Sequence, residues 1–275
     1  MLVDGKAMRI IALTEKYRIT MLEHNSLSEY ETTFPELFDH YFKYWADRKR
    51  FFRALDNKEL QERLNLFYAR LPQIGKWFNN SELPAEKPRL VLFVGQDCTN
   101  GHAFKHKDEF LVWIPVEAYR TAMQVDVFVT HEMIHGLHYS KVPEFYFESA
   151  NEKYSMARQL ITEGLATYLT LKIVKVSEDE ALRADYLPED RRFEWIEKCK
   201  NNRKELFKFA LENFYSENRD FFEADNPVDI YKYRAGYYVG FEAIKKIAEE
   251  QNLTVQELLN LPRGRFEDFI LQALS

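Results

Sequence analysis

The stretch His131-Glu132-Met133-Ile134-His135 decides how this chain is interpreted. In a helix, residues four positions apart lie on the same face, so the two imidazoles can approach a single ion. Glu132 lies about 100° around the helix from His131, which places its carboxylate beside that ion and leaves it free to handle a water molecule. The spacing therefore predicts a zinc site with an adjacent proton acceptor.

The residues ahead of this motif favour a buried helix, because Val125, Val127, Phe128 and Val129 are apolar. A buried helix carries two histidines and a glutamate only at a cost unless those groups bind something. Metal binding supplies such a reason. An ordinary helix that happens to carry two histidines remains the alternative.

A catalytic zinc takes three protein ligands and keeps a fourth position for water, so one more ligand is needed. His138 continues the same helix face but lies about 10 Å farther along the axis than His131. We expect it at the rim of the site, in contact with a ligand, or simply at the end of the helix. A third histidine six residues after the second is excluded, because Lys141 occupies that position. A carboxylate on a following helix remains, and Glu163 fits that role.

Glu163 lies in the segment Ile161-Thr162-Glu163-Gly164-Leu165-Ala166-Thr167-Tyr168. Together with the histidine motif, this segment resembles the gluzincin metallopeptidases. In that family the glutamate before the glycine is the third zinc ligand, which the resemblance carries over to Glu163. Thr162 and Thr167 depart from the family's pattern, so the groups around the ligand cannot be transferred.

A later segment, residues 236–241, extends the resemblance to bacterial proteins described as predicted zinc-dependent proteases. The likeness covers roughly residues 90–260. It implies an α+β, mostly helical, zincin-like fold, in which a small mixed sheet packs on the active-site helix and a helical C-terminal lobe follows. It also implies a zinc-dependent peptidase with one Zn²⁺ per chain and a peptide or protein as substrate.

The expected mechanism gives Glu132 the role of general base toward a water activated by zinc. The oxyanion that forms during peptide hydrolysis also needs a donor. Relatives use a Tyr or a His from the C-terminal lobe, and no histidine follows His138. Tyr237 is our choice, with Arg234 as the runner-up and Tyr233 on the same helix face.

Two further functions compete with a peptidase. A di-iron carboxylate protein needs a second Glu-x-x-His unit, and Glu163 is followed by Ala166 where that histidine belongs. A catalytically silent peptidase fold that binds zinc or a partner as a regulator is the stronger rival. Intact Glu132 argues against it, because a binding-only site has no use for a base.

The composition of the chain argues against some classes of binding partner. The chain has 275 residues, 46% of them hydrophobic, and a formal net charge of −6. This charge and the lack of a long basic run argue against nucleic acid, and no apolar run is long enough to span a membrane. The first ten residues lack a secretory signal, and Cys98 and Cys199 are expected to be reduced thiols, so we expect a cytoplasmic protein. The oligomeric state is not indicated.

Apolar spacing and turn-rich breaks predict three parts: an N-terminal strand or hairpin with a helical wall at 1–80, a core at 89–175, and a helical C-terminal lobe at 190–275. The resemblance implies that the part at 89–175 is the zincin-like catalytic core. The resemblance implies that the segment 101–104 lies at a sheet edge that pairs with substrate backbone, and an ordinary loop is the alternative. His102 and His106 are not expected to be ligands. The predicted elements are a strand or hairpin within 8–22, strands at 90–94 and 110–114, and helices at 34–45, 60–71, 152–174, 191–215, 234–250 and 254–273.

Overall fold

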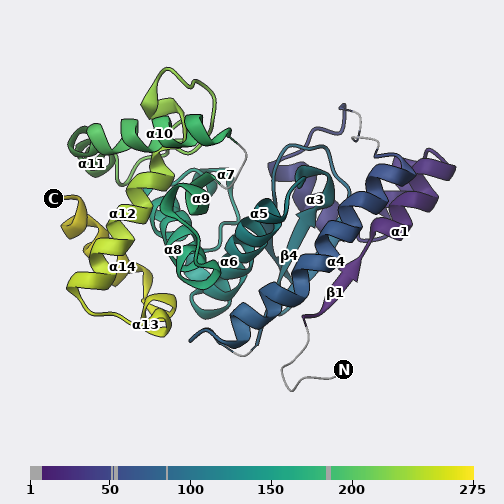
Figure 1. Cartoon of the computed structure of the whole chain (residues 1–275), viewed down its shortest axis with the longest axis horizontal. Helices are drawn as coiled ribbons and strands as arrows, with labels where there is room; N and C mark the ends of the chain where they lie inside the picture. The colour runs from purple at the N-terminus through teal and green to yellow at the C-terminus, as the bar shows by residue number, and fades with distance from the viewer. Residues whose placement is uncertain (1–7, 51, 53–54, 85, 184–186) are drawn as a thin grey trace. The chain divides into compact units, whose positions relative to one another are not determined.

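A mixed sheet of four strands, in the order β1-β2-β4-β3, forms the frame of the N-terminal half (Figure 1). The strands β1, β2 and β4 run parallel, and β3 pairs antiparallel with β4 at the edge. This arrangement confirms the predicted α+β fold with a small mixed sheet. The strands are β1 (Ile10–Ala12), β2 (Arg89–Phe93), β3 (His102–His106) and β4 (Glu109–Pro115).

The structure is a computed structural model that describes residues 8–50, 52, 55–84, 86–183 and 187–275. The first seven residues, which enter the expectation about a secretory signal, lie outside this described part. The chain divides into two units, residues 1–137 and 138–275, and the boundary falls inside a single helix. The three-part division at 1–80, 89–175 and 190–275 stays a prediction.

Both faces of the sheet are covered within the first unit, because successive side chains of a strand point to opposite faces. On one face, Tyr41 of α3 contacts Phe93 and Trp113 edge to face, with ring centroids 5.2 and 5.4 Å apart. On the other face, Val112 of β4 packs against the helix that carries the histidine motif. The two central strands, β2 and β4, are accordingly almost continuous apolar runs, as expected for strands buried on both faces.

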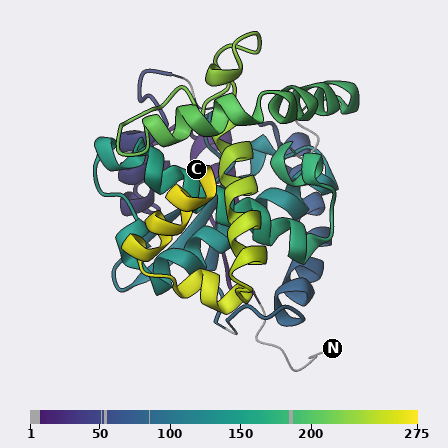
Figure 2. The same cartoon turned by 90° about the vertical axis from the view of Figure 1, so that its left-hand side faces the viewer.

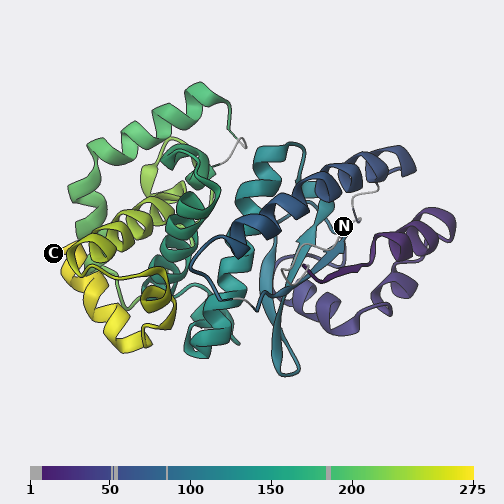
Figure 3. The ribbon, with the colours of Figure 1, turned by 60° about the horizontal axis from the view of Figure 1, so that its bottom comes forward.

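Helix α4 is the longest helix of the first unit, and it runs alongside the sheet in Figures 1 and 3. It begins with a capping box in which the Asp56 side chain accepts from the Glu59 backbone N–H and the Glu59 carboxylate accepts in return. Phe67 packs it on Tyr119. The helices of this unit are α1 (Thr14–Tyr17), α2 (Leu27–Glu31), α3 (Pro35–Tyr44), α4 (Asn57–Asn79), α5 (Ala122–Gln124) and α6 (Thr130–Lys141).

The prediction of a strand or hairpin within 8–22 is confirmed in its simpler form. Of the two apolar runs in this range only the first contains a strand, β1, whereas the second runs into the π-helical segment Arg18–Glu23 that continues α1. Thr20 explains part of the difference, since its hydroxyl donates to the Lys16 carbonyl one turn earlier. A β-branched residue can satisfy its hydroxyl locally in this way and remain helical.

The regular structure of the second unit is helical, apart from isolated bridges, over the residues that the structure describes. Figure 2 shows α12 running through this unit, with α14 in yellow beside it. The predicted helix at 191–215 is two helices that meet at Asn202, and the predicted helix at 254–273 is broken at Leu261 and Pro262. The helices are α7 (Ala150–Lys153), α8 (Met156–Val174), α9 (Glu178–Arg183), α10 (Glu189–Asn201), α11 (Arg203–Glu212), α12 (Ala235–Glu250), α13 (Val255–Asn260) and α14 (Arg263–Leu274).

Among the described residues, we find no helix with both the length and the apolar character that crossing a membrane requires.

Candidate metal centre

Helix α6 carries the motif and is buried around its whole circumference. His131, Glu132 and His135 are 4%, 6% and 3% exposed, although all three are polar. The helix continues without interruption from the π-helical segment Val125–Val129, whose Asp126 makes a two-bond ion pair with Arg70 of α4 at 2.9 and 2.7 Å. The side chains of the motif are therefore held in place from the N-terminal side of the helix.

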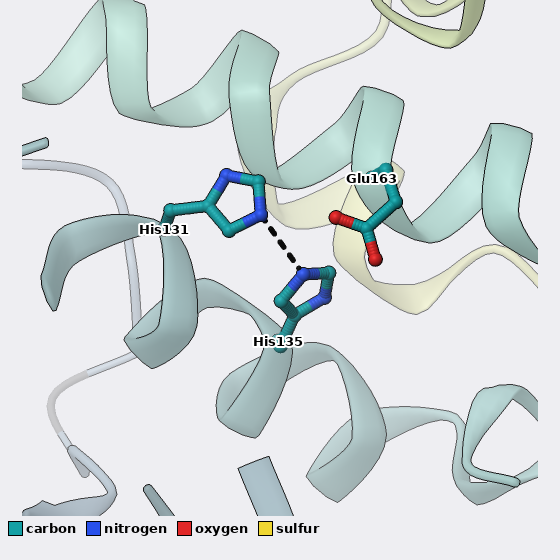
Figure 4. Close-up of side chains that lie close together, drawn as sticks. All are labelled: His131, His135 and Glu163. Atoms are coloured by element: carbon teal, nitrogen blue, oxygen red, sulfur yellow. Dashed lines mark hydrogen bonds between the residues drawn. The ribbon is translucent and has the colours of Figure 1, made fainter. Parts of the chain in front are cut away.

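The two imidazoles converge as the spacing predicts. The Nε2 atoms of His131 and His135 lie 3.0 Å apart and point toward one another (Figure 4). Two nitrogens bound to one tetrahedral zinc, each about 2.0 Å from it, would be separated by about 3.3 Å. This separation fits a shared ion closely.

The carboxylate of Glu163 on α8 joins the histidines. One ligand atom from each of His131, His135 and Glu163 lies within 4.8 Å of the others (Figure 4). Helix α6 spans the boundary between the two units, and its last turn is tied to α8 inside the second unit, where Arg158 Nη1 donates to Tyr139 Oη at 3.5 Å. Two imidazoles and one carboxylate are the donor set of a catalytic zinc, so the residues present fit that ion.

The position of Glu163 on α8 depends on the residue that follows it, Gly164. A Cβ on Gly164 would lie 2.4 Å from the backbone carbon and oxygen of Gly240 on α12, a distance that real Cβ atoms do not adopt. The two helices therefore cross with their backbones in contact, which only glycine permits. Tyr237, the predicted oxyanion donor, lies one turn before Gly240 on the same helix α12.

Glu132 faces the turn that leads into the edge strand β3. A Cβ on Gly101 would lie 2.8 Å from Glu132 Cγ and 3.0 Å from Ile114 Cδ1. The φ angle of Gly101 is +151°, which favours glycine independently of space. The segment 101–104 thus lies beside the proposed base at the sheet edge, although Ala103 and Phe104 themselves are buried.

The remaining histidines lie elsewhere. His138 is 1% exposed and packs against Phe145, with ring centroids 4.5 Å apart, so it is outside the ligand group, as predicted from its axial distance. His102 stacks on His40 with nearly parallel rings, and His106 packs against Phe34.

One buried acid was missed in the sequence. Glu117 follows β4 directly and is fully buried, and its Oε1 accepts from the Asp97 backbone N–H at 3.1 Å. Burial raises the pKa of this carboxyl to about 7. Its neighbour Tyr41 accepts from the Gln96 backbone N–H and contacts Cys98 Sγ at 3.2 Å. These bonds hold the segment that leads from β2 toward Gly101, and a single glutamate in an apolar run gives no sequence signal for such a role.

Residues 80–268 match a family model described as predicted Zn-dependent protease (DUF2268). The chain belongs to this family. The matched region includes all three ligand candidates, Glu132 and Tyr237. Comparisons with curated proteins and with solved structures gave no match. Membership in this family agrees with the predicted resemblance and supports a zinc-dependent hydrolase of the protease class.

Proposed function

We propose that this protein is a zinc peptidase in which His131, His135 and Glu163 hold one Zn²⁺ per chain. The convergence of these three ligand atoms within 4.8 Å is the observation that carries the proposal. Membership in a family described as predicted Zn-dependent protease supports it. Bound zinc would polarise the substrate carbonyl and lower the pKa of the attacking water toward about 7.

Glu132 acts as the general base of the proposed reaction. Glu132 is 6% exposed and directly follows His131, one of the proposed ligands. Its carboxylate accepts a proton from the attacking water and then delivers that proton to the leaving amine. The absence of a side chain on Gly101 leaves the space that the Glu132 side chain occupies, because a Cβ there would lie 2.8 Å from Glu132 Cγ.

Tyr237 donates to the oxyanion in this mechanism. It is half-buried on the first turn of α12, and Arg234 lies over its ring with Cζ 4.0 Å from the centroid. The positive charge of Arg234 makes the Tyr237 hydroxyl a stronger hydrogen-bond donor, because it stabilises the negative charge that develops on the phenol oxygen as the hydroxyl donates. The substrate class in this proposal is a peptide or protein, as the description of the family suggests.

Replacement of Glu132 by Gln tests the catalytic assignment. The E132Q protein should keep one zinc, because the ligands are untouched, and should lose hydrolysis of a peptide library by about 10²–10⁴-fold. Zinc content by mass spectrometry and rates on quenched fluorescent peptides are the measurements. Glu194, exposed on α10, provides the matched control variant E194Q, which should behave as wild type.

Replacement of Glu163 by Ala tests the third ligand. E163A should bind zinc more weakly by more than the roughly 10–100-fold that loss of an outer-shell partner costs. Zinc retained at normal affinity in E163A would exclude Glu163 from the metal centre. Wild-type protein that binds zinc but cleaves no peptide would instead favour the silent, regulatory alternative.

A further inference from the structure

The second unit holds two arginines close to each other, one of them buried and the other half-buried. Arg183, the last residue of α9, is 6% exposed, and Arg234 lies at the start of α12. In the part of the chain that the structure describes, no aspartate or glutamate forms an ion pair with either guanidinium. Burial, followed by the positive charge of Arg234, lowers the pKa of Arg183 to about 10.

Two aromatic rings account for part of the stabilisation of Arg183. Its Cζ lies 5.0 Å from the Trp195 ring and 4.7 Å from the Tyr233 ring. Tyr233 also forms a side-chain hydrogen bond with this guanidinium, and the ring contacts leave the other N–H donors, which lie in the guanidinium plane, available. Arg183 Nε and Nη2 are buried and find no acceptor among the described residues, and the same holds for Arg234 Nε.

Buried charges in proteins are paired or bind a ligand, since an unpaired charge costs several kcal/mol to bury. Paired guanidiniums with unused in-plane donors match the geometry of a carboxylate, which accepts two parallel N–H bonds. A neutral ligand would leave the repulsion between the two cations in place. The chemistry therefore selects an anion of carboxylate size.

The position of this pair relates it to Glu163 within the same unit. Arg234 lies over Tyr237, and the next turn of α12 brings Gly240 against Gly164, the neighbour of Glu163. Six residues of helix separate Arg234 from Gly240, which corresponds to about 9 Å along the axis. An extended peptide covers that distance in two or three residues, at about 3.3 Å each.

We propose that Arg183 and Arg234 form a carboxylate-binding subsite for the peptide substrate, two or three residues from the bond that is cleaved. This inference rests on the proposed peptidase function and deepens it. The subsite selects substrates by charge, so peptides with a carboxylate at that distance bind more tightly than their neutral counterparts.

Peptides that differ only in the terminal group test the subsite on the zinc-loaded, full-length protein. A quenched fluorescent peptide with a free C-terminal carboxylate two or three residues beyond the cleaved bond should have a KM roughly 10–100-fold lower than its C-terminal amide, the range expected for charge-assisted hydrogen bonds. In R183Q this difference in KM should vanish, because the carboxylate loses its partner. Exposed Arg191 on α10 gives the matched control R191Q, which should preserve the difference.

Amidated peptides that carry one glutamate at successive positions beyond the cleaved bond distinguish the source of the carboxylate. If the terminal carboxylate is the ligand, none of them recovers the lower KM. If a side-chain carboxylate is also accepted, one position recovers it. Both results support the subsite, whereas equal KM values for the acid, the amide and every glutamate peptide in wild-type protein overturn it.

Direct binding separates this inference from the catalytic one. Anisotropy titrations of labelled acid and amide peptides on E132Q need no turnover, and R183Q or R234Q in that background should abolish the preference for the acid. R234Q serves where R183Q fails to fold, because Arg234 is only half-buried. A retained preference without any hydrolysis in wild type leaves the subsite standing and rejects the peptidase. If wild-type protein hydrolyses peptides but the acid and the amide bind equally, the peptidase function stands and the subsite is rejected. If the arginine variants lose binding of the acid and the amide equally, the two arginines have only a structural role and the subsite is rejected.

Discussion

The two helices that carry the proposed metal ligands are supported in different ways. On α6 the proposed ligand His135 is followed by Gly136, and a Cβ there would lie 2.8 Å from Pro88 Cγ and 3.0 Å from Val112 Cγ2. On α8 the proposed ligand Glu163 is followed by Gly164, whose Cβ would meet the backbone of another helix. In both cases a glycine beside the ligand brings the helix against its support.

The two contacts differ in how far the atoms opposite each glycine can move. Side-chain atoms such as those of Val112 shift by a few tenths of an ångström at modest cost, whereas the backbone of α12 moves only if a whole helix moves. We call the contact of Gly136 with β4 and Pro88 the sheet support, and the contact of Gly164 with Gly240 the helix support. The comparison indicates that the position of Glu163 is the more sensitive of the two to sequence change.

The largest effect is expected at the helix support. G164A should lower the free energy of unfolding by about 3 kcal/mol or more, because overpacking against backbone exceeds the roughly 1 kcal/mol gained in helix propensity. Zinc affinity should fall together with stability. Gly264 on α14 has open space where a Cβ would lie, with no atom within 4 Å among the described residues, so G264A is the control. Urea unfolding and zinc titration are the measurements, and wild-type stability in G164A would end the comparison.

Next in size is a pH effect confined to the unit that holds the sheet support. Burial raises the pKa of Glu117 from 4.5 to about 7. Between these values the folded chain keeps a proton that the unfolded chain releases, so the stability due to this group is full below pH 4.5 and is lost as pH rises toward about 7. The loss amounts to about 3 kcal/mol.

E117Q tests this effect, since an amide does not ionise. The free energy of unfolding of wild type should fall from about pH 5 to about pH 7 more steeply than that of E117Q, as measured by urea unfolding at several pH values. E194Q should keep the wild-type slope. Parallel slopes in wild type and E117Q would show that Glu117 does not titrate in this range.

A smaller effect is expected at the sheet support itself. G136A should cost about 1 kcal/mol, because the added methyl group meets Pro88 and Val112 but gains helix propensity. The double variant G136A/V112A restores space at one of the two contacts and should recover part of the loss beyond the cost of V112A alone. Thermal unfolding of wild type, both single variants and the double variant measures the coupling. A G136A protein less stable than G164A would reverse the order of the two supports.

The smallest effect has the opposite sign. Gly75 lies inside α4, and no atom of the described residues comes within 4 Å of an added Cβ. G75A should therefore stabilise the protein by about 0.5–1 kcal/mol through helix propensity alone. If G75A lowers the free energy of unfolding, the space around the added Cβ does not govern the effect of glycine-to-alanine changes in this chain. The interpretation of the sheet support and of the helix support would then be wrong as well.

The parts of the site that depend on local spacing could be predicted from sequence. His131 and His135 meet because four residues of helix bring them to one face, and this holds wherever the helix lies. The exclusion of His138 rests on the same geometry. Glu163 required a resemblance, because nothing in the spacing fixes which following helix returns to the histidines. The crossing that positions it depends on Gly164 and Gly240, which are far apart in the chain.

The failures of sequence interpretation have identifiable causes. The helix predicted over 254–273 ignored Pro262, which removes a backbone donor and disfavours helix at Leu261. The break near Asn202 has no such marker, since the Asn202 side chain donates to the Lys198 carbonyl only once the turn has formed. The proximity of Arg183 to Arg234 gave no sequence signal either, because it depends on how the helices pack and not on any local pattern.

The π-helical segment Val125–Val129 has a consequence for how the length of this chain can vary. A wide turn of this kind holds one residue more than the α-helical turn it replaces while the helix on either side keeps its direction. Removal of one residue from this segment would restore a regular helix and leave His131 and His135 facing the same way. Within Thr130–Lys141, by contrast, the same deletion would rotate everything beyond it by about 100°. The segment just ahead of the ligands is thus the point in this helix where a gain or loss of one codon is compatible with an unchanged metal centre.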